Sequence, residues 1–96
     1  MKGSYPMRSN HELLKLHKYI CLELKHERQE QRLTQEKVAY DLGFPASYLS
    51  NIENGKKDTT SLVTYLKIAN YYDVDIDVIC KKAKAKMKID ECDFDE

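Results

Sequence analysis

Small hydrogen-bonding side chains gather in one short segment of this 96-residue chain, residues 46–54. Leu49 and Ile52 lie three residues apart within it, which predicts the inward stripe of a helix. The outward face then carries small or polar side chains: Ala46, Ser47, Tyr48, Ser50 and Asn51. Hydroxyl and amide groups pair with the edges of DNA bases, and methyl or ring carbons contact the thymine methyl group. The segment therefore predicts a helix that lies in the major groove.

Each outward side chain has a partner on DNA and an ordinary alternative. The Asn51 amide can bond the N7 and N6 edge of adenine, worth about 1–3 kcal/mol of discrimination, or it can simply face water. Ser47 can reach a base or cap its own helix. Ala46 and Tyr48 can press on a thymine methyl group, but the Tyr48 ring can equally be half-buried. Since residues 46–53 contain no Arg or Lys, we expect a half-site rich in A·T pairs that is read partly through DNA shape.

A second short helix must hold this segment in place. Thr34 can cap a helix that turns three apolar residues inward: Val38, Ala39 and Leu42. Gly43 can take a positive φ, which ends that helix and turns the chain sharply. Phe44 is then expected to enter the core, and Pro45 stands beside the start of the next helix, where its missing N–H is harmless. Residues 54–55, an Asn-Gly pair, stop that helix.

Three further helices complete an all-α prediction of five helices without a strand. The first runs from near Asn10 to about Arg32, with the inward stripe Leu13, Leu16, Ile20 and Leu24. Its charged residues are expected to face water: Lys15, Lys18, Glu23, Lys25 and Arg28. Another helix is capped by residue 59, 60 or 61 and turns inward Leu62, Tyr65, Leu66, Ile68 and Ala69. The last follows a cap at Asp75 and turns inward Ile76, Val78, Ile79 and Ala83.

The chain is predicted to be one small domain with two appendages: a flexible arm over residues 1–10, the helical domain over residues 11–88 and an acidic tail over residues 89–96. The net charge is zero, but residues 1–57 hold ten Lys and Arg against seven Asp and Glu. The five lysines of 81–88 are interpreted as a solvated face, with a second phosphate contact as the alternative. A further hypothesis is that the tail acids fold back on basic groups and weaken DNA binding.

Several other classes of protein are disfavoured by the sequence. No apolar run is long enough for a membrane span and the first ten residues lack a secretory signal, so we expect a cytoplasmic protein with no membrane contact. Three cysteines, Cys21, Cys80 and Cys92, form no C-x-x-C pair and are expected to be free thiols. His17 and Cys21 share a helical face, but two ligands do not make a structural zinc site. No catalytic constellation is visible, so we expect neither an enzyme nor a cofactor or metal.

Four segments of the chain carry a family resemblance: 33–39, 42–43, 48–56 and 66–69. On these segments, from Ile20 to Ile79, the sequence resembles the Cro and phage-repressor family of helix-turn-helix proteins, often labelled Xre-type regulators. The resemblance implies a compact five-helix bundle with the lambda-repressor-like DNA-binding fold, which dimerises and inserts the helix after Pro45 into the major groove.

The resemblance also implies roles for single residues. Gln35 falls at the family glutamine that binds the DNA backbone, Ser47 and Asn51 where members touch base edges, and Asn54 and Lys56 where phosphate is held. Lys57 joins the phosphate contacts because it follows in the same loop, and further candidates are Lys37, Arg28 and Arg32. Two departures stand out. Ala46 replaces a glutamine that reads adenine together with the first glutamine, and Arg32 replaces a glycine, which predicts strain at the end of the first helix.

These observations predict a sequence-specific transcription regulator that binds double-stranded DNA as a homodimer on a pseudo-palindromic operator, with repression as the default. The alternative is a helix-turn-helix module that binds a protein, as in an antitoxin or an antagonist of another regulator. Near-zero charge and the lack of arginine in the second motif helix favour it, but the sequence does not identify that partner. Five apolar residues can close a dimer interface or finish the monomer core: Tyr71, Tyr72, Val74, Ile76 and Ile79.

Overall fold

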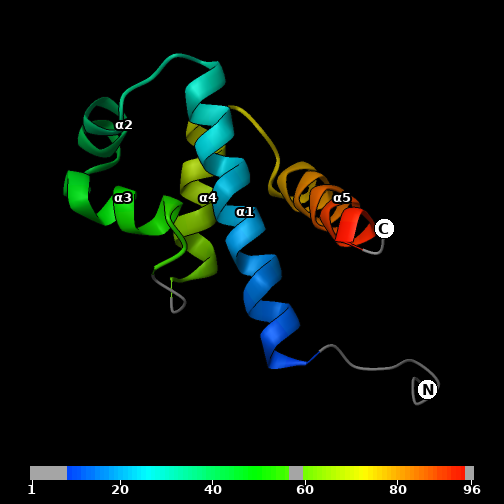
Figure 1. Ribbon diagram of the computed structural model, residues 1–96. Helices are drawn as coiled ribbons and strands as arrows, with labels where there is room; N and C mark the ends of the chain where they lie inside the picture. Colours follow the sequence, from blue (N-terminus) through cyan, green and yellow to red (C-terminus); the bar gives the residue numbers. More distant parts are fainter. Residues whose placement is uncertain (1–8, 57–59, 95–96) are drawn as a thin grey trace.

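A computed structural model describes residues 9–56 and 60–94, which form five α-helices and no strand (Figure 1). The helices are α1 (Asn10–Glu30), α2 (Gln35–Leu42), α3 (Ala46–Glu53), α4 (Leu62–Tyr71) and α5 (Ile76–Phe94). The predicted all-α fold of five helices is therefore confirmed. The expected arm, apart from its last two residues, lies outside the described residues, as does Lys57.

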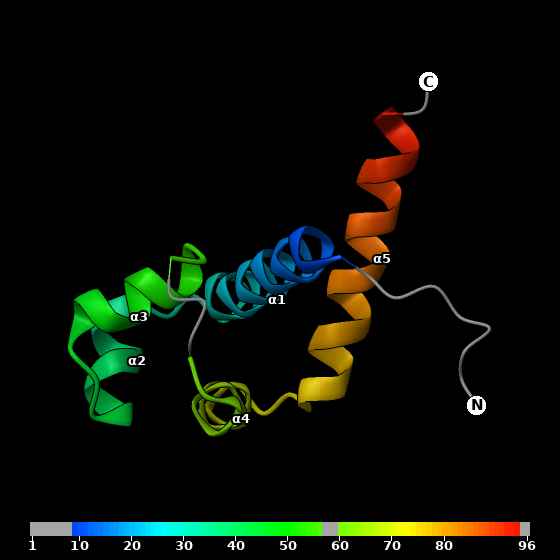
Figure 2. The ribbon, with the colours of Figure 1, turned by 90° about the horizontal axis from the view of Figure 1, so that it is seen from below.

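The first helix, α1, runs through the middle of the molecule. In both views α2 and α3 lie on one side of it and α5 lies on the other (Figures 1 and 2). A capping box fixes its start, because Ser9 Oγ accepts from the Glu12 amide at 3.1 Å while the Glu12 carboxylate accepts from the Ser9 amide at 3.0 Å. Among the described residues, α1 packs mainly against α5 and α3, while α2 packs against α3 and α4.

One core lies between α1 and the helices around it. Its largest fully buried side chains are Tyr72, Leu24, Leu49, Ile52, Ile68, Ile79, Val38 and Cys21. Most of the predicted inward positions are confirmed, but Leu13, Leu62, Leu66 and Val78 are not. These side chains are 48%, 65%, 41% and 37% exposed, so the prediction that they face inward is wrong. Leu62 and Leu66 lie four residues apart on one face of α4, whereas the buried residues Tyr65, Ile68 and Ala69 turn a different face to the core.

Two charged residues of α1 are buried, although the sequence predicts that they face water. Glu23 is 4% exposed, and one carboxylate oxygen lies 2.8 Å from Lys86 Nζ of α5. Arg28 is 9% exposed and pairs with Glu53 of α3. A buried charge needs a partner, and in both cases that partner comes from another helix, which helical periodicity alone cannot reveal.

The last helix is longer than the sequence suggests. A separate acidic tail from residue 89 was the expectation, but α5 continues through Phe94. Its buried face, Ile79, Ala83 and Met87, packs against α1. The acidic residues beyond this face also find partners on α1, because Asp90 accepts from the Tyr19 hydroxyl and Glu91 lies 3.6 Å from Lys15. These contacts explain why the helix does not stop at Lys88.

Within the part of the chain that the structure describes, no helix is both long and apolar enough to cross a membrane.

Candidate nucleic-acid interface

The turn between α2 and α3 forms as the sequence predicts. Thr34 Oγ1 caps α2 by accepting from the Lys37 amide at 3.1 Å. Gly43 takes φ +77° at the end of α2, in the left-handed region that favours glycine. The chain then reverses, and Pro45 immediately precedes α3 with φ −62°. Two helices of eight residues each are therefore held at a fixed angle by a short rigid connection.

The third helix has one buried side and one open side. Leu49 and Ile52 are fully buried, whereas Ala46, Ser47 and Asn54 are exposed and Asn51 is partly exposed. Ser47, Asn51 and Asn54 follow at spacings of four and three, so they lie along one line on the open side. Short hydroxyl and amide side chains on such a line can form hydrogen bonds with base edges in the major groove.

Tyr48 and Ser50 lie at the edges of this open side, and both are half-buried. The Tyr48 ring packs edge to face against Phe44, with ring centroids 5.0 Å apart. Phe44 itself packs against the core, as predicted. Of the two interpretations of Tyr48, the structure supports the half-buried ring.

A buried ion pair fixes α3 from behind. Arg28 of α1 reaches both carboxylate oxygens of Glu53, with Nε 2.8 Å from Oε2 and one terminal nitrogen 3.1 Å from Oε1. The other terminal nitrogen of Arg28 donates to the Leu33 carbonyl at 2.8 Å. Gln35, the first residue of α2, donates its amide to Glu53 Oε1 at 2.8 Å. One carboxylate therefore joins the end of α1, the start of α2 and the end of α3.

This network changes how three residues are interpreted. Hydrogen bonding to Glu53 raises the pKa of the Arg28 guanidinium above its usual value, so Arg28 stays charged inside the fold. Arg28 is therefore a positioning residue and not an exposed phosphate contact. Gln35 is half-buried with its amide nitrogen turned to Glu53. Glu53 follows Leu49 by four residues, so the spacing already placed it on the buried side, but sequence reasoning did not use this signal.

The first helix of the motif, α2, is also hydrogen bonded to α4. The Tyr71 hydroxyl donates to Asp41 at 2.6 Å, and Lys37 lies 3.2 Å from the same carboxylate. The hydrogen bond from Tyr71, and to a smaller extent the one from Lys37, holds the pKa of Asp41 below its usual value. These surface contacts orient α2, whose own short length gives little stability.

The far end of α3 leads into the loop that carries the predicted phosphate contacts. Gly55 takes φ +69°, and the Lys56 amide donates to the Asn51 carbonyl at 2.9 Å. This is the left-handed end that the Asn-Gly pair predicts. Asn54 and Lys56 are exposed. Both side chains are therefore available to a ligand that lies against the open side of α3.

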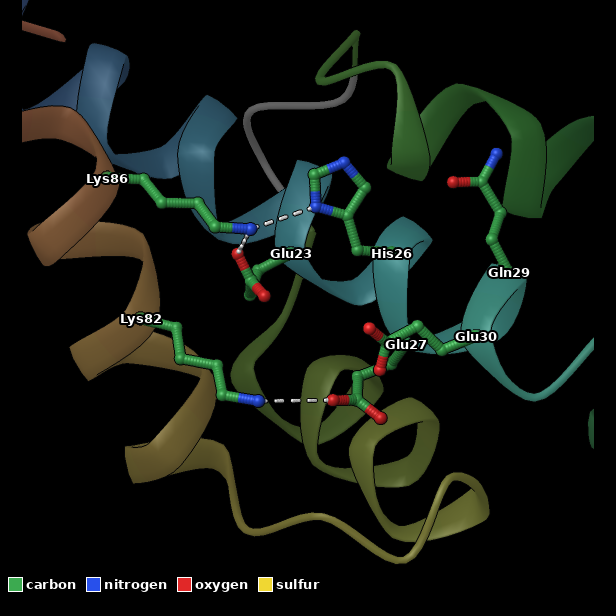
Figure 3. A pocket seen from close by; sticks show the side chains of 7 residues that line it. All are labelled: Glu23, His26, Glu27, Gln29, Glu30, Lys82 and Lys86. Carbon is green, nitrogen blue, oxygen red and sulfur yellow. Dashed lines mark hydrogen bonds and ion pairs between the residues drawn. The ribbon is translucent and has the colours of Figure 1, made fainter.

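A polar hollow of about 580 Å³ lies elsewhere, between α1 and α5 (Figure 3). Two ion pairs cross it: Lys82 lies 3.5 Å from Glu27, and Lys86 lies 2.8 Å from Glu23. Lys86 also lies 3.1 Å from His26 Nδ1. Because α5 and α3 lie on opposite sides of α1, this hollow is separate from the open side of α3.

The His17 and Cys21 pair lies in the core side of α1 and faces α4. The Cys21 thiol is fully buried, 3.6 Å from His17 Nε2, and the same histidine nitrogen is hydrogen bonded to the Tyr65 hydroxyl. Burial raises the pKa of the Cys21 thiol. Among the described residues, no cluster of three or more His, Cys, Asp or Glu side chains is arranged to hold a metal ion.

Two short helices joined at a left-handed glycine, with polar side chains on the open side of the second, define a helix-turn-helix DNA-binding domain. A family model described as helix-turn-helix matches residues 24–79, more than half of the chain. The chain belongs to this family, the Cro and phage-repressor or Xre type, and it is a DNA-binding transcription regulator. A comparison with curated proteins gives no match.

Proposed function

We propose that this regulator binds a pseudo-palindromic operator as a homodimer and represses transcription. The observation that carries the proposal is the open line of Ser47, Asn51 and Asn54, opposite a side of α3 that is fully buried. Such a helix can enter the major groove without disturbing the core. Repression follows as the default, because a small DNA-bound domain can block polymerase without any further activity.

The proposed base contacts come from the open side of α3. Asn51 pairs with adenine through its amide, and Ser47 bonds to a neighbouring base edge. Ala46 and the exposed edge of Tyr48 contact a thymine methyl group, while Ser50 lies close to the groove wall. The absence of Arg and Lys from residues 46–53 favours A·T pairs over G·C pairs.

The proposed phosphate contacts lie at both ends of the motif. Asn54, Lys56 and Lys57 lie in sequence after the base-reading face, and Gln35 begins α2, where unpaired backbone N–H groups attract an anion. The Gln35 amide nitrogen already serves Glu53, so its part on DNA falls to the backbone N–H groups of the helix start. Lys56→Ala is expected to lower the slope of log K against log salt by about one unit, equally for all sequences.

The proposed dimer needs surface other than the one the sequence suggested. Of the five apolar residues between 71 and 79, Tyr72 and Ile79 are buried and the others pack partly against the core, which supports the alternative that the set finishes the monomer core. Exposed apolar side chains lie on α4 instead: Leu62 and Val63 are 65% and 58% exposed. A dimer on a pseudo-palindromic operator needs its two α3 helices about one turn of DNA, roughly 34 Å, apart.

Selection of random duplex DNA on the protein tests the proposal. An enriched palindrome with two A·T-rich half-sites is the expected product. Asn51→Ala should then lose about 1–3 kcal/mol of preference at one base pair in each half-site. Gln29→Ala is the control, because Gln29 is an exposed amide of α1 away from both the open side of α3 and the exposed apolar residues of α4. Selection that enriches no sequence would reject specific DNA recognition.

The second candidate function is a module that binds another protein. It is favoured by the same exposed apolar side chains of α4 and by the zero net charge. The selection experiment separates the two candidates, because a protein-binding module enriches no duplex. A DNA partner would also place the protein in the cytoplasm, and this localisation is part of the proposal.

A further inference from the structure

A cleft of about 430 Å³ opens between the first half of α1 and the end of α3. One face of α1 forms its wall, because His11, Leu14, Lys15 and Lys18 follow at spacings of three, one and three. His17 and Gly55 complete the lining, and among the described residues that line the cleft none is acidic. We infer that this cleft binds a phosphate group.

The charges of the cleft suit an anion. Lys18 is exposed and makes no ion pair with any described residue, so its ammonium group is available. Lys15 shares its charge with Glu91, but at 3.6 Å this pair leaves donor capacity toward the cleft. Ammonium groups bind phosphate as compact point charges, and imidazole N–H groups add hydrogen bonds. Two lysines and His11 can therefore bind one phosphate group, while His17 lines the cleft with its Nε2 hydrogen bonded to the Tyr65 hydroxyl.

The glycine in the lining keeps the two walls close. A Cβ atom at Gly55 would lie 3.0 Å from Lys18 Cγ, nearer than ordinary side-chain contacts allow. The bare backbone of residue 55 therefore braces the stem of Lys18. Asn54 and Lys56 flank this glycine, so the cleft begins where the open side of α3 ends.

The position of the cleft favours the DNA backbone as the source of the phosphate. The first half of α1 extends past α3 on the side away from α2 (Figure 1). Gly55 of the cleft directly follows Asn54 of the open line, so a duplex that reaches Asn54 comes next to this cleft. This source rests on the proposed function. A free phosphorylated compound has the same chemistry and is the other source that the experiment distinguishes.

The experiment uses the full chain and two matched variants. Lys18→Met removes the charge but keeps an unbranched stem against Gly55. Lys84→Met removes one charge from an exposed position on α5, on the other side of α1. Inorganic phosphate is titrated at constant ionic strength while the ring resonances of His11 and His17 are followed by NMR. Binding to a selected duplex is measured in parallel as a function of salt.

The two arms give separate expectations. A backbone phosphate in the cleft predicts that Lys18→Met lowers the salt slope of DNA binding by about one unit and that Lys84→Met leaves it unchanged. If a free phosphate compound is the ligand, the ring resonances of His11 and His17 should shift and saturate with phosphate. The affinity for phosphate should be about tenfold lower in Lys18→Met, and the salt slope of DNA binding should not change. Either result, or both, supports the cleft.

Other outcomes overturn the inference. The cleft is not a phosphate site if the two variants have the same salt slope and inorganic phosphate moves neither histidine, or moves them equally in Lys18→Met. If the wild-type chain binds no duplex at all, the proposed function fails, and the phosphate titration alone decides the cleft. The two failures can thus be told apart.

Discussion

A single carboxylate, that of Glu53, determines how the DNA-facing helix is held. Its side chain is 1% exposed and accepts three hydrogen bonds, two from Arg28 and one from Gln35. A bidentate pair of this kind fixes direction as well as distance. The open line of α3 therefore owes its orientation to Arg28 and Glu53, whose side chains are buried on the opposite side of this helix.

Removal of one partner from this buried pair should be far more harmful than removal of both. Arg28→Ala leaves the Glu53 charge buried without its counter-ion and is expected to lower the free energy of unfolding by about 3–5 kcal/mol. The double variant Arg28→Ala with Glu53→Leu should lose less than the sum of the losses of the two single variants, Arg28→Ala and Glu53→Leu. Urea unfolding measures all four proteins. Additive losses would show that the pair is not coupled.

Cysteine reactivity should separate two thiols. Cys21 is fully buried, whereas Cys80 is partly exposed. Iodoacetamide at pH 8 is expected to modify the peptide that carries Cys80 well before the one that carries Cys21, and mass spectrometry after digestion follows both. Equal rates in urea provide the control. Rapid labelling of Cys21 in the native protein would contradict its burial.

The same burial gives a pH dependence. Because the pKa of the folded Cys21 thiol is raised, its contribution to stability is complete below the ordinary thiol pKa and is lost as pH rises through the folded value. The unfolded chain ionises first, so alkaline pH favours unfolding. Urea midpoints between pH 7 and pH 10 should fall more steeply for the wild type than for Cys21→Ala. Parallel curves would assign the loss to other groups.

At the scale of single helices, the backbone just after α1 is strained, as the sequence predicts. Arg32 takes φ +59°, although it has a side chain. This conformation costs about 1–2 kcal/mol for an ordinary residue, and the greater chain entropy of glycine offsets part of the gain on replacing it. Arg32→Gly is therefore expected to raise the free energy of unfolding by up to about 1 kcal/mol. Arg32→Ala keeps the strain and serves as the control in urea unfolding.

The last helix offers a matched pair of substitutions. Met87 is 5% exposed against α1, and Ile89, two residues on, is 59% exposed. Met87→Ala is expected to cost about 2–5 kcal/mol, because it leaves a cavity under α5. Ile89→Ala should change stability by less than about 0.5 kcal/mol. Thermal unfolding of both variants decides whether α5 packs as a structural part of the domain.

The elements differ in how well the sequence predicts them. Thr34, Gly43 and Pro45 act through local backbone geometry, so their roles could be predicted without any knowledge of neighbouring helices. Glu23 and Arg28 could not be placed, because each is buried only when a charge from a distant helix meets it. The acidic end of α5 resembled a loose tail for the same reason, since its partners lie on α1, some seventy residues earlier.

At the scale of the whole molecule, the positive groups are divided between two sides. The lysines of α5 lie on the side of α1 opposite α3, and Lys82 and Lys86 are already paired with Glu27 and Glu23.

The hypothesis that acids 90–96 weaken DNA binding predicts that truncation after Lys88 tightens DNA binding. Asp90 and Glu91 contact α1, and Glu91 pairs with Lys15 of the cleft, so we expect truncation to reduce stability and, where the cleft holds a DNA phosphate, to tighten binding by the folded chain. Duplex titration and urea unfolding measure the two effects separately.

Self-association is a property of the whole molecule. A homodimer predicts a sedimentation mass that rises with concentration toward twice 11.3 kDa. Val63→Lys should shift this equilibrium toward the single chain, because a buried unpaired charge is costly in an interface. Ile89→Lys, which puts the same charge on an exposed apolar position of α5, controls for a simple change of charge. A mass that stays at one chain at all concentrations would refute the dimer.

The pair formed by Arg28 and Glu53 has a consequence for evolution and engineering. The contacts that hold α3 lie on its buried side. Ser47, Asn51 and Asn54 on its open side can therefore be substituted with little loss of stability. Substitution of these three residues alone could thus change which operator is preferred, in evolution or by design, while the melting temperature stays nearly constant. A chain built in this way is free to acquire new targets without first acquiring new stability.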